Sequence, residues 1–515
     1  MNRHIIFHFI FACIFCGYLI VGFHIFRDYG VPIDEFSQID LGRVNYERIT
    51  KGSLEIQKHF DRYYGPMFEV SLYAFSHGIA SLALGMEEMS SRRLIMFIFF
   101  AVSLIFYYRC ISMIFNHPAY GLIAVILLLC SPRIFAESFY NTKDIAFLSS
   151  VIFVLWAFVR IQLFTWKNLV LLSAFTGFAM SMRAQGLLVL AAIMTTFLVY
   201  GKEDISKRII FAFLYGIFAL LVTYLMFPVF WNDPMKNIIG FWQSSVNSIG
   251  VPTYYFGKIL VSPNIPWHYH FIWVAISSLL SVVLTCLFGI VWFVLFHVRN
   301  SLAVHAQHRA LIAMACIVLG TFAMSVFFHP RSYDGWRHIY YIYPCMIGFS
   351  MYTIKVFFEY RKTRIFVFLF ALVVVSIFAD VIHATMFMMK NHPNQYVYFN
   401  ALAGGYARAK ANFDFDYWGI SYKQLYEYLR TMPIKKTTYI YYEQVLPYTK
   451  FVMIPRLYEK GMHVVQTAQE ADIYVSIQRD YKMPPPPGFH KLYAVTVDGV
   501  EVSTIYVADV YRKTL

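Results

Sequence analysis

Long apolar runs alternate with short polar stretches over the first three quarters of the chain. A helix that crosses a membrane needs about 20 mostly apolar residues. The pattern therefore predicts an α-helical polytopic membrane protein with about eleven transmembrane helices. The predicted spans are residues 5–26, 93–115, 119–135, 145–164, 168–183, 186–200, 208–229, 271–297, 309–328, 338–357 and 365–389.

The chain changes character after residue 390, where the apolar runs end. Residues 419–432 place apolar side chains at the spacing of an amphipathic helix, and short β-rich runs follow. This pattern predicts a small α/β domain over residues 391–515, behind a membrane module of residues 1–390. The expected strands are residues 437–442, 450–454, 472–477, 492–497 and 502–507, the last two joined by a turn at Asp498 and Gly499.

The composition supports a membrane protein. Hydrophobic residues make up 59% of the 515 positions and charged residues only 14%, whereas soluble domains have about 25% charged residues. This balance excludes an ordinary cytosolic enzyme. The net charge of +14 is explained by basic cytoplasmic loops, so we expect no nucleic-acid partner. The seven cysteines lie in or beside apolar runs and form no disulfide framework.

The distribution of Lys and Arg predicts the orientation in the membrane. With a cytoplasmic N-terminus, every short basic connection except Arg92-Arg93 falls on the cytoplasmic side. Eleven spans in the cytoplasmic (inner) membrane then place the C-terminus on the outer, extracytoplasmic side. The unusual polar residues fall on the outer side, where we expect the chemistry. The outer segments are residues 27–92, 136–144, 230–270, 329–337 and 391–515.

Adjacent carboxylates open the first outer loop, at Asp34 and Glu35. They are candidates for acid–base chemistry, and the alternative is a solvated loop or a helix N-cap. The second outer loop contains Glu137, Lys143 and Asp144. Charges between two membrane helices are costly unless they pair or line a polar cavity, so an ion-pair network and a functional site are both open.

Arg183 lies at the outer end of a predicted span. An arginine at this depth suggests a functional role, such as holding a phosphate, and its alternative is pairing with a loop carboxylate. Asp334, Arg337 and His338 belong to a cationic segment with Trp336 beside them. Such a segment can hold a lipid phosphate or simply anchor the chain among lipid headgroups.

Aromatic residues are frequent in the third outer segment, and Tyr255 and Trp267 are the candidates for contact with a sugar or an acceptor. The alternative is the aromatic belt that membrane proteins place at the interface.

Several blocks together resemble the protein O-mannosyltransferase and aminoarabinose lipid A transferase type of glycosyltransferase (family 39, the GT-C fold), in its bacterial branch. The resemblance rests on the Asp34-Glu35 pair and four further blocks, and it covers residues 1 to about 425. These blocks are residues 133–144 (RIFAESFYNTKD), 333–338 (YDGWRH), 392–400 (HPNQYVYFN) and 416–421 (DYWGIS).

The resemblance implies an enzyme that takes a sugar from a polyprenyl-phosphate carrier and gives it to a hydroxyl of a glycan, glycolipid or protein, with inversion. We expect Asp34 as the general base, with Glu35 orienting either Asp34 or the acceptor. The implied donor-phosphate ligands are Arg183, Arg337, Lys143 and His338. Glu137, Asp144 and Asp334 would support these side chains or position a divalent metal ion, which stays open. A flippase or transporter of an amphipathic anion is the alternative function.

Overall fold

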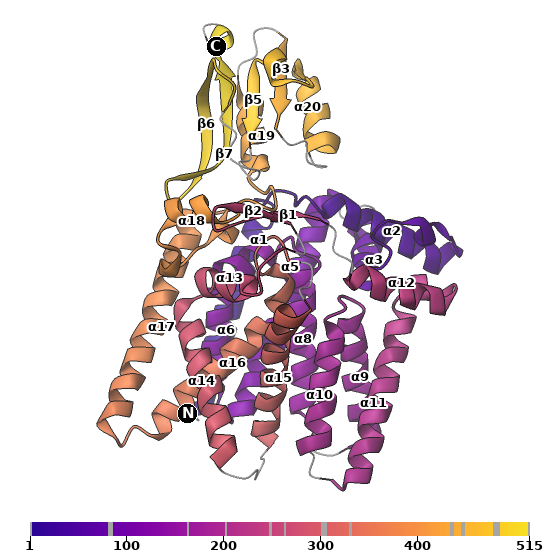
Figure 1. Ribbon diagram of the computed structural model, residues 1–515, viewed down its shortest axis with the longest axis vertical. Helices are drawn as coiled ribbons and strands as arrows, with labels where there is room; N and C mark the ends of the chain where they lie inside the picture. The colour runs from indigo at the N-terminus through magenta and orange to yellow at the C-terminus, as the bar shows by residue number, and fades with distance from the viewer. Residues whose placement is uncertain are drawn as a thin grey trace.

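The computed structural model describes residues 3–80, 86–161, 164–200, 203–246, 250–261, 264–299, 306–328, 332–432, 437–443, 449–476 and 485–512. Figure 1 shows a bundle of helices with a small β-containing domain at one end. The N-terminus lies at the opposite end of the bundle from the C-terminus. The fold class expected from the sequence, a helical polytopic chain with a small α/β domain, is confirmed.

Each predicted span coincides with helical structure. Among the described residues, five helices (α1, α5, α11, α15 and α17) are long and apolar enough to cross a membrane. The run 271–297 is broken into two helices, and the run 338–357 begins with the 3-10 helix η4 (Arg337–Ile342). The number of spans stays a prediction. The bundle helices are α1 (Arg3–Ile25), α5 (Glu88–Phe115), α6 (Pro118–Leu129), α8 (Asp144–Val159), α9 (Trp166–Met180), α10 (Gly186–Tyr200), α11 (Ile205–Leu225), α13 (Tyr269–Ser277), α14 (Leu280–Arg299), α15 (Ala306–Phe327), α16 (Tyr343–Glu359) and α17 (Arg364–Lys390).

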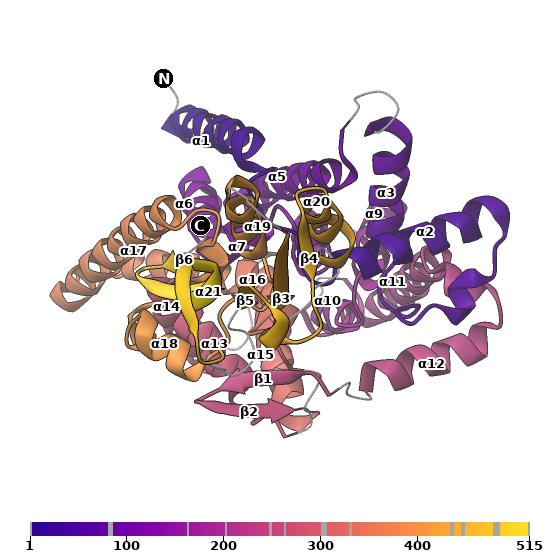
Figure 2. The ribbon, with the colours of Figure 1, turned by 90° about the horizontal axis from the view of Figure 1, so that it is seen from above.

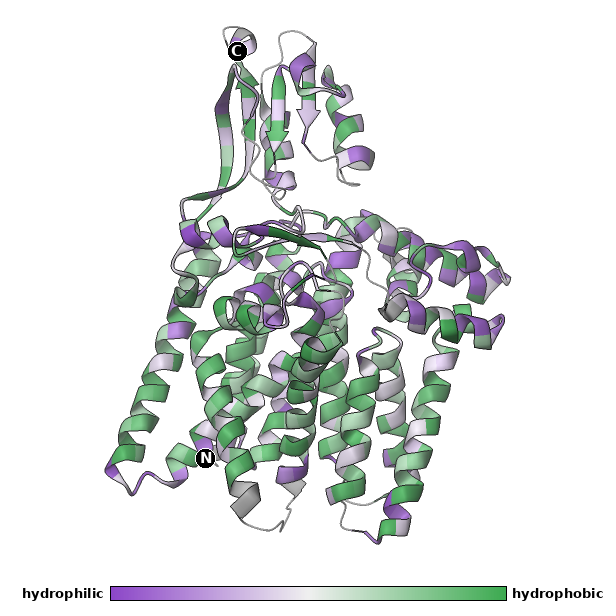
Figure 3. Cartoon of the chain, in the orientation of Figure 1, coloured by the Kyte–Doolittle hydropathy of each residue, from purple (hydrophilic) through white to green (hydrophobic). Residues whose placement is uncertain are grey.

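The sides of the helical bundle, which face away from its core, are apolar, as expected where lipid replaces water. None of the residues in the most apolar 18-residue stretch of α17 is buried inside the protein. In the corresponding stretch of α1, only 11% of the residues are buried. Figure 3 shows hydrophobic residues along the bundle helices and hydrophilic residues at their ends. Because such surfaces are costly in water, the bundle is that of a multi-pass membrane protein.

Short elements cover the end of the bundle that carries the small domain (Figure 1). Most come from the loops between bundle helices, and the last three come from the segment after α17. Two of them, β1 and β2, form an antiparallel hairpin. These elements are α2 (Glu35–Lys51), η1 (Glu55–Lys58), α3 (Met67–Ala74), η2 (Phe75–Ala80), α7 (Pro132–Glu137), η3 (Pro228–Trp231), α12 (Pro234–Val246), β1 (Pro252–Tyr255), β2 (Lys258–Val261), η5 (Gln395–Val397), η6 (Ala401–Ala403) and α18 (Tyr406–Asn412).

The C-terminal domain is a five-stranded sheet in the order β4-β3-β5-β7-β6. Strands β4, β3 and β5 are parallel, whereas β5, β7 and β6 are antiparallel. Asp498 and Gly499, both at positive φ (49° and 81°), form the predicted turn between β6 and β7. The elements are α19 (Tyr422–Thr431), β3 (Thr438–Tyr442), η7 (Thr449–Met453), α20 (Ile454–Tyr458), β4 (Met462–Val464), η8 (Ala468–Glu470), β5 (Ile473–Ser476), β6 (Phe489–Val497), β7 (Val500–Ala508) and α21 (Asp509–Arg512).

One strand prediction was wrong. Residues 450–454 are helical, within η7 and the start of α20, instead of extended. Met453 and Leu457 are both buried in the domain core, and their spacing of four places them on one helical face. Pro455 lies in the first turn of α20, where its missing N–H costs nothing.

The core of the small domain begins at Tyr422, whereas residues 396–420 pack in the large core of the bundle. The predicted boundary at residue 391 stays a prediction. Polar contacts join the two parts: Lys423 Nζ donates to the carbonyl oxygens of Arg27 (2.6 Å) and Asp28 (3.0 Å). The Asp498 N–H donates to Asn391 Oδ1 at 3.0 Å. The domain is therefore tied to the segment after α1 and to the end of α17.

Candidate active site

The loop predicted to be the first outer one, residues 27–92, places Asp34 directly before α2. Ile33 N–H donates to the carbonyl oxygen of Trp418 (3.0 Å), and a Cβ at Gly30 would lie only 2.2 Å from the carbonyl oxygen of Ile420. This close approach requires glycine and presses the loop against residues 418–420. The Asp34 side chain makes no N-cap hydrogen bond to α2 and is 32% exposed, so it does not serve as the helix cap and is partly accessible to solvent.

The block at residues 416–421 is a turn that supports this loop. The Asp416 carboxylate accepts hydrogen bonds from the backbone N–H groups of Gly419 (2.7 Å), Ile420 (3.1 Å) and Ser421 (3.0 Å). A buried carboxylate satisfied by three donors fixes the backbone there. The block therefore positions the Asp34 loop.

The second outer loop turns sharply before α8. Asn141 Oδ1 accepts hydrogen bonds from the backbone N–H groups of Lys143 (3.2 Å) and Asp144 (2.8 Å). This turn is of the kind that Asn forms with the backbone two and three residues on. The Asn141 amide donates to Glu137 (2.7 Å) and Asp144 (3.0 Å), so one side chain orients both acidic residues.

The turn before η4 is the third segment that supplies charged side chains to the candidate site. Asp334 and Gly335 both have positive φ, 54° and 74°, and the Gly335 N–H donates to the Tyr269 hydroxyl at 3.0 Å. This turn brings the Asp334 carboxylate to 2.9 Å from Arg337 Nη2.

Six predicted residues meet in one charged cluster: Asp34, Asp144, Asp334, Lys143, Arg183 and Arg337. Lys143 Nζ lies 3.3 Å from Asp34 Oδ2. Arg337 Nη1 lies 3.7 Å from Asp34 Oδ2 and 3.3 Å from Asp144 Oδ2. Arg183 Nη2 pairs with Asp144 Oδ1. The three cations balance the three carboxylates.

Exposure within the charged cluster is uneven. The Asp34, Lys143 and Arg183 side chains are 32%, 16% and 10% exposed, whereas those of Asp144, Asp334 and Arg337 are at most 3% exposed. The Arg337 guanidinium lies 4.4 Å from the centre of the Trp418 ring, and Lys143 Nζ lies 5.0 Å from the Tyr64 ring. The cluster is thus accessible at Asp34 and Lys143 and closed behind Arg337.

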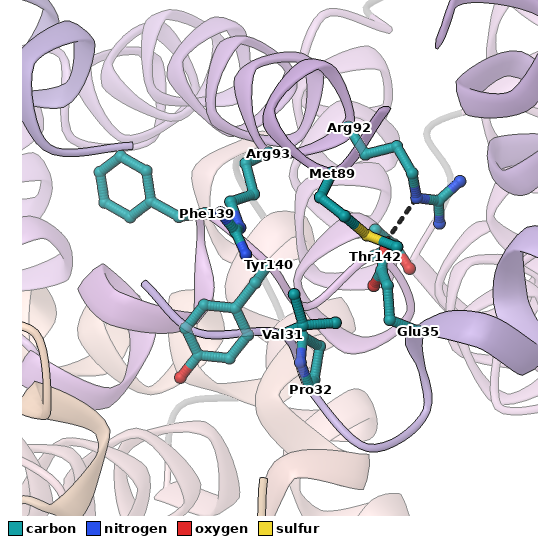
Figure 4. A pocket seen from close by; sticks show the side chains of 9 residues that line it. All are labelled: Val31, Pro32, Glu35, Met89, Arg92, Arg93, Phe139, Tyr140 and Thr142. Atoms are coloured by element: carbon teal, nitrogen blue, oxygen red, sulfur yellow. Dashed lines mark hydrogen bonds and ion pairs between the residues drawn. The ribbon is translucent and has the colours of Figure 1, made fainter. Parts of the chain in front are cut away.

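Glu35 does not join the charged cluster. Its carboxylate lies 2.5 Å from Arg92 Nε, and Arg92 Nη2 lies 2.6 Å from Glu69. Thr142 Oγ1 also donates to Glu69. Figure 4 shows the Glu35–Arg92 pair beside a small pocket, which is lined by Val31, Pro32, Glu35, Met89, Arg92, Arg93, Phe139, Tyr140 and Thr142.

Glu69 and Arg92 were missed by the sequence prediction. Burial raises the pKa of the Glu69 carboxyl, and the guanidinium of Arg92 opposes this shift. The signal for Arg92 was present, because Arg92-Arg93 is the exception to the basic-loop pattern. Glu69 lies in a semi-apolar stretch that gives no such signal. The Glu35–Arg92–Glu69 group joins the first outer loop to α5 and to the second loop.

Glu137 lies behind the charged cluster, linked to Asp144 through Asn141. The hydroxyls of Tyr340 (2.8 Å) and Tyr417 (3.1 Å) donate to Glu137 Oε1. Burial raises the pKa of Glu137 to about 7, because the charged form loses its hydration. Glu137 therefore supports the second loop.

The other three predicted residues, His338, Tyr255 and Trp267, form none of the ion pairs described above. His338 is buried and its ring centre lies 4.6 Å from that of Tyr333. Its Nδ1 has no hydrogen-bond partner among the residues that the structure describes. The Tyr255 hydroxyl lies 2.7 Å from His268 Nδ1. Trp267 is 55% exposed, and its ring neighbours are His268 and Phe271. The structure therefore does not bring Tyr255 and Trp267 into the charged cluster.

A divalent ion was an open expectation for the acidic residues. Within the described ranges, no group of three or more His, Cys, Asp and Glu side chains is arranged to hold a metal ion. Asp144 is taken up by two arginines and Glu137 by two tyrosine hydroxyls, so these residues do not fit a metal site as they stand.

A comparison with models of protein families finds a match for the segment that contains the second loop of the candidate site. Residues 75–227 match the family model described as dolichyl-phosphate-mannose-protein mannosyltransferase. The match contains Lys143, Asp144 and Arg183, whereas Asp34, Asp334 and Arg337 lie outside it. The resemblance to a glycosyltransferase of this type, expected from the sequence, is confirmed over the matched segment. A comparison with curated protein sequences found no match.

Two solved structures show similarity to this chain. ArnT from Cupriavidus metallidurans, bound to undecaprenyl phosphate, has 13% identity and a TM-score of 0.49, with 97% of this chain and 98% of that chain covered. The archaeal oligosaccharyltransferase AglB from Archaeoglobus fulgidus, in complex with an inhibitory peptide and a dolichol-phosphate, has 11% identity and a TM-score of 0.41, with 74% and 54% covered.

Proposed function

We propose that this chain is a membrane glycosyltransferase that moves a sugar from a polyprenyl-phosphate donor to an acceptor hydroxyl at the outer face of the cytoplasmic membrane. The observation that carries the proposal is the contact of the accessible Asp34 carboxylate with Lys143 and Arg337, at 3.3 Å and 3.7 Å. Transfer from a lipid phosphate needs a base and fixed positive charge at one point. The family match over residues 75–227 supports the same reaction class.

In the proposed step the acceptor oxygen attacks the anomeric carbon of the sugar. A new carbon–oxygen bond forms while the bond from that carbon to the phosphate oxygen breaks. Asp34 accepts the hydroxyl proton, and the electron pair of the broken bond leaves with the polyprenyl phosphate. Attack opposite the leaving group inverts the configuration at the anomeric carbon.

The two neighbours of Asp34 are suited to different tasks. Lys143 is the more exposed cation and meets the leaving phosphate in the proposed step. Arg337 is 2% exposed and lies within 3.7 Å of three carboxylates. Its geometry supports a role in holding Asp34 and Asp144 in place. Arg183, paired with the buried Asp144, has the geometry of the scaffold alternative.

The proposal is tested by mass spectrometry of envelope glycans and lipids from cells that lack the gene. We expect one sugar to be lost from one class of molecule and restored by the wild-type gene. Asp34→Asn should not restore it. Asp40→Asn, which alters an exposed carboxylate on α2 (48% exposed), is the matched control and should restore it. Full restoration by Asp34→Asn would contradict the proposed base.

The Asp34→Asn variant and an assay with purified protein together separate an enzyme from a carrier. A transporter of a lipid-linked sugar needs no general base, so Asp34→Asn would be expected to keep transport while a cation variant loses it. A purified wild-type protein that converts a polyprenyl-phosphate sugar to free polyprenyl phosphate, in the presence of envelope extract as acceptor, supports transfer. Unchanged donor under these conditions would overturn the proposal.

A further inference from the structure

The helix α12 carries an apolar stripe on one face. Met235, Ile238, Ile239 and Trp242 are 71%, 47%, 52% and 63% exposed. Their spacing of three, four and seven residues places them on one side of the helix. An exposed patch of large apolar side chains marks an interaction surface.

The opposite face of α12 fixes the helix to the protein. Asn237 is buried, it accepts a hydrogen bond from the Tyr63 hydroxyl at 3.2 Å, and it donates to Gln57 Oε1 at 3.2 Å. The ring of Phe241 lies 5.8 Å from Phe227 and 5.9 Å from Phe230. The apolar stripe therefore faces away from the protein because the other side is occupied.

The stripe continues an apolar surface that already faces the membrane. Helix α12 follows α11 through η3. It lies at the level just beyond the end of α11 (Figure 1) and to one side of that helix when seen from above (Figure 2). Along α11, Leu220, Leu221 and Leu225 are 52%, 47% and 57% exposed. Since α11 is one of the helices apolar enough to span, this continuity indicates lipid as the occupant of the stripe.

We propose that α12 is an interfacial helix whose apolar stripe inserts into the membrane leaflet on the side of the charged cluster. Helices of this kind bury their apolar face about 5–10 Å into the boundary between headgroups and acyl chains. Lys236 and Gln243 are also exposed and flank the stripe, where a long basic side chain can reach lipid phosphate.

The position of α12 connects this membrane contact to the candidate site. Its partner Tyr63 is followed by Tyr64, whose ring lies 5.0 Å from Lys143 Nζ, and by Gly65, which packs against the carbonyl oxygens of Ser181 and Met182. The leaflet thus holds the loop at the rim of the charged cluster. This consequence rests on the proposed function, whereas the membrane contact itself does not.

The contact is measured with the full-length protein in phosphatidylcholine liposomes that contain lipids brominated along the acyl chain. A fluorescent amino acid replaces Trp242, and a second sample carries it at Tyr439, an exposed position of the small domain (44% exposed). We expect strong quenching at position 242, greatest for bromines near the headgroup, and quenching at least about two-fold weaker at position 439. Equal quenching at both positions would overturn the proposal.

A matched pair of variants tests the stripe. Ile239→Glu adds a charge within it, and Gln243→Glu adds the same charge beside it. We expect Ile239→Glu to reduce the quenching of the reporter at position 242 and Gln243→Glu to leave it unchanged, with the same melting temperature for both. Crosslinking between position-239 cysteines of two chains, together with no quenching, would assign the stripe to a second copy and overturn the proposal. These readouts require no enzyme activity, so their failure is distinct from failure of the proposed function.

Discussion

The ammonium of Lys143 lies 3.3 Å from Asp34 Oδ2, although 109 residues separate the two along the chain. Lys143 occupies the N-cap position of α8, and Asp34 occupies that of α2. Two helix ends therefore set this distance. The contact joins the proposed base to the proposed phosphate ligand, and it defines what substitutions at the site should do.

Replacement of Asp34 by Asn should give a folded protein that binds donor but does not turn it over. The amide keeps the size and hydrogen bonding of the carboxylate but cannot accept the proton, and loss of a general base costs about 10²–10⁴-fold in rate. Turnover and the melting temperature in detergent check this. Retention of more than about a tenth of wild-type turnover would place the base elsewhere, with Asp144 as the next candidate.

The cations Arg183 and Lys143 should behave differently on substitution. Arg183 pairs with Asp144, which is 1% exposed, so Arg183→Met leaves a buried carboxylate with one cation fewer and should lower the melting temperature without ligand. Breaking a buried pair costs about 3–5 kcal/mol. Lys143→Met should melt like the wild type but lose the stabilisation that a polyprenyl phosphate provides. The reverse pattern would make Arg183 the phosphate ligand.

Arg92 should be essential for folding stability. It lies between Glu35 and Glu69, at 2.5 Å and 2.6 Å, and all three side chains are at most 6% exposed. Arg92→Met leaves two buried carboxylates and should destabilise by about 3–5 kcal/mol. Adding Glu69→Gln to Arg92→Met should recover part of this loss, because one charge is then removed. Thermal melting of the two single variants and the double variant measures the coupling.

Glu137 should make stability depend on pH. Burial raises the pKa of Glu137 to about 7 in the folded protein, above its value of about 4.3 in an unfolded chain. The folded state therefore binds this proton more tightly, and the stabilisation is full below pH 4.3 and is lost as pH rises through about 7. The melting temperature of the wild type relative to Glu137→Gln should fall between pH 5 and pH 8, over which ordinary Glu residues stay ionised. A constant difference would show that Glu137 is ionised throughout.

The basic-loop pattern predicts that the C-terminal domain lies outside the cytoplasm. A reporter that is active only outside, fused after Leu515, should be active, and a cytoplasmic reporter at the same position should be silent. The opposite result would move Asp34 and the charged cluster to the cytoplasmic side and contradict the proposed donor side.

The sequence by itself determined the helical bundle, the small α/β domain and the segments that hold the candidate site. Transfer of a side chain between water and lipid is a local property, so apolar runs can be located without knowing their neighbours. The same cost identifies charged residues that must have partners, which is how Lys143, Asp144, Arg183 and Arg337 were found. Arg92 was visible only as an exception to the basic-loop pattern and was not predicted as a site residue.

Only the tertiary structure decided which charges meet. The cost of a buried charge requires a partner but does not name it, and Asp34 faces Lys143 and Arg337 while its neighbour Glu35 faces Arg92. Adjacent residues at a helix start point in different directions, so their roles depend on the elements packed against each one. Glu69 gave no signal in the sequence, because a single carboxylate in a semi-apolar stretch becomes buried only when α3 packs beside α5.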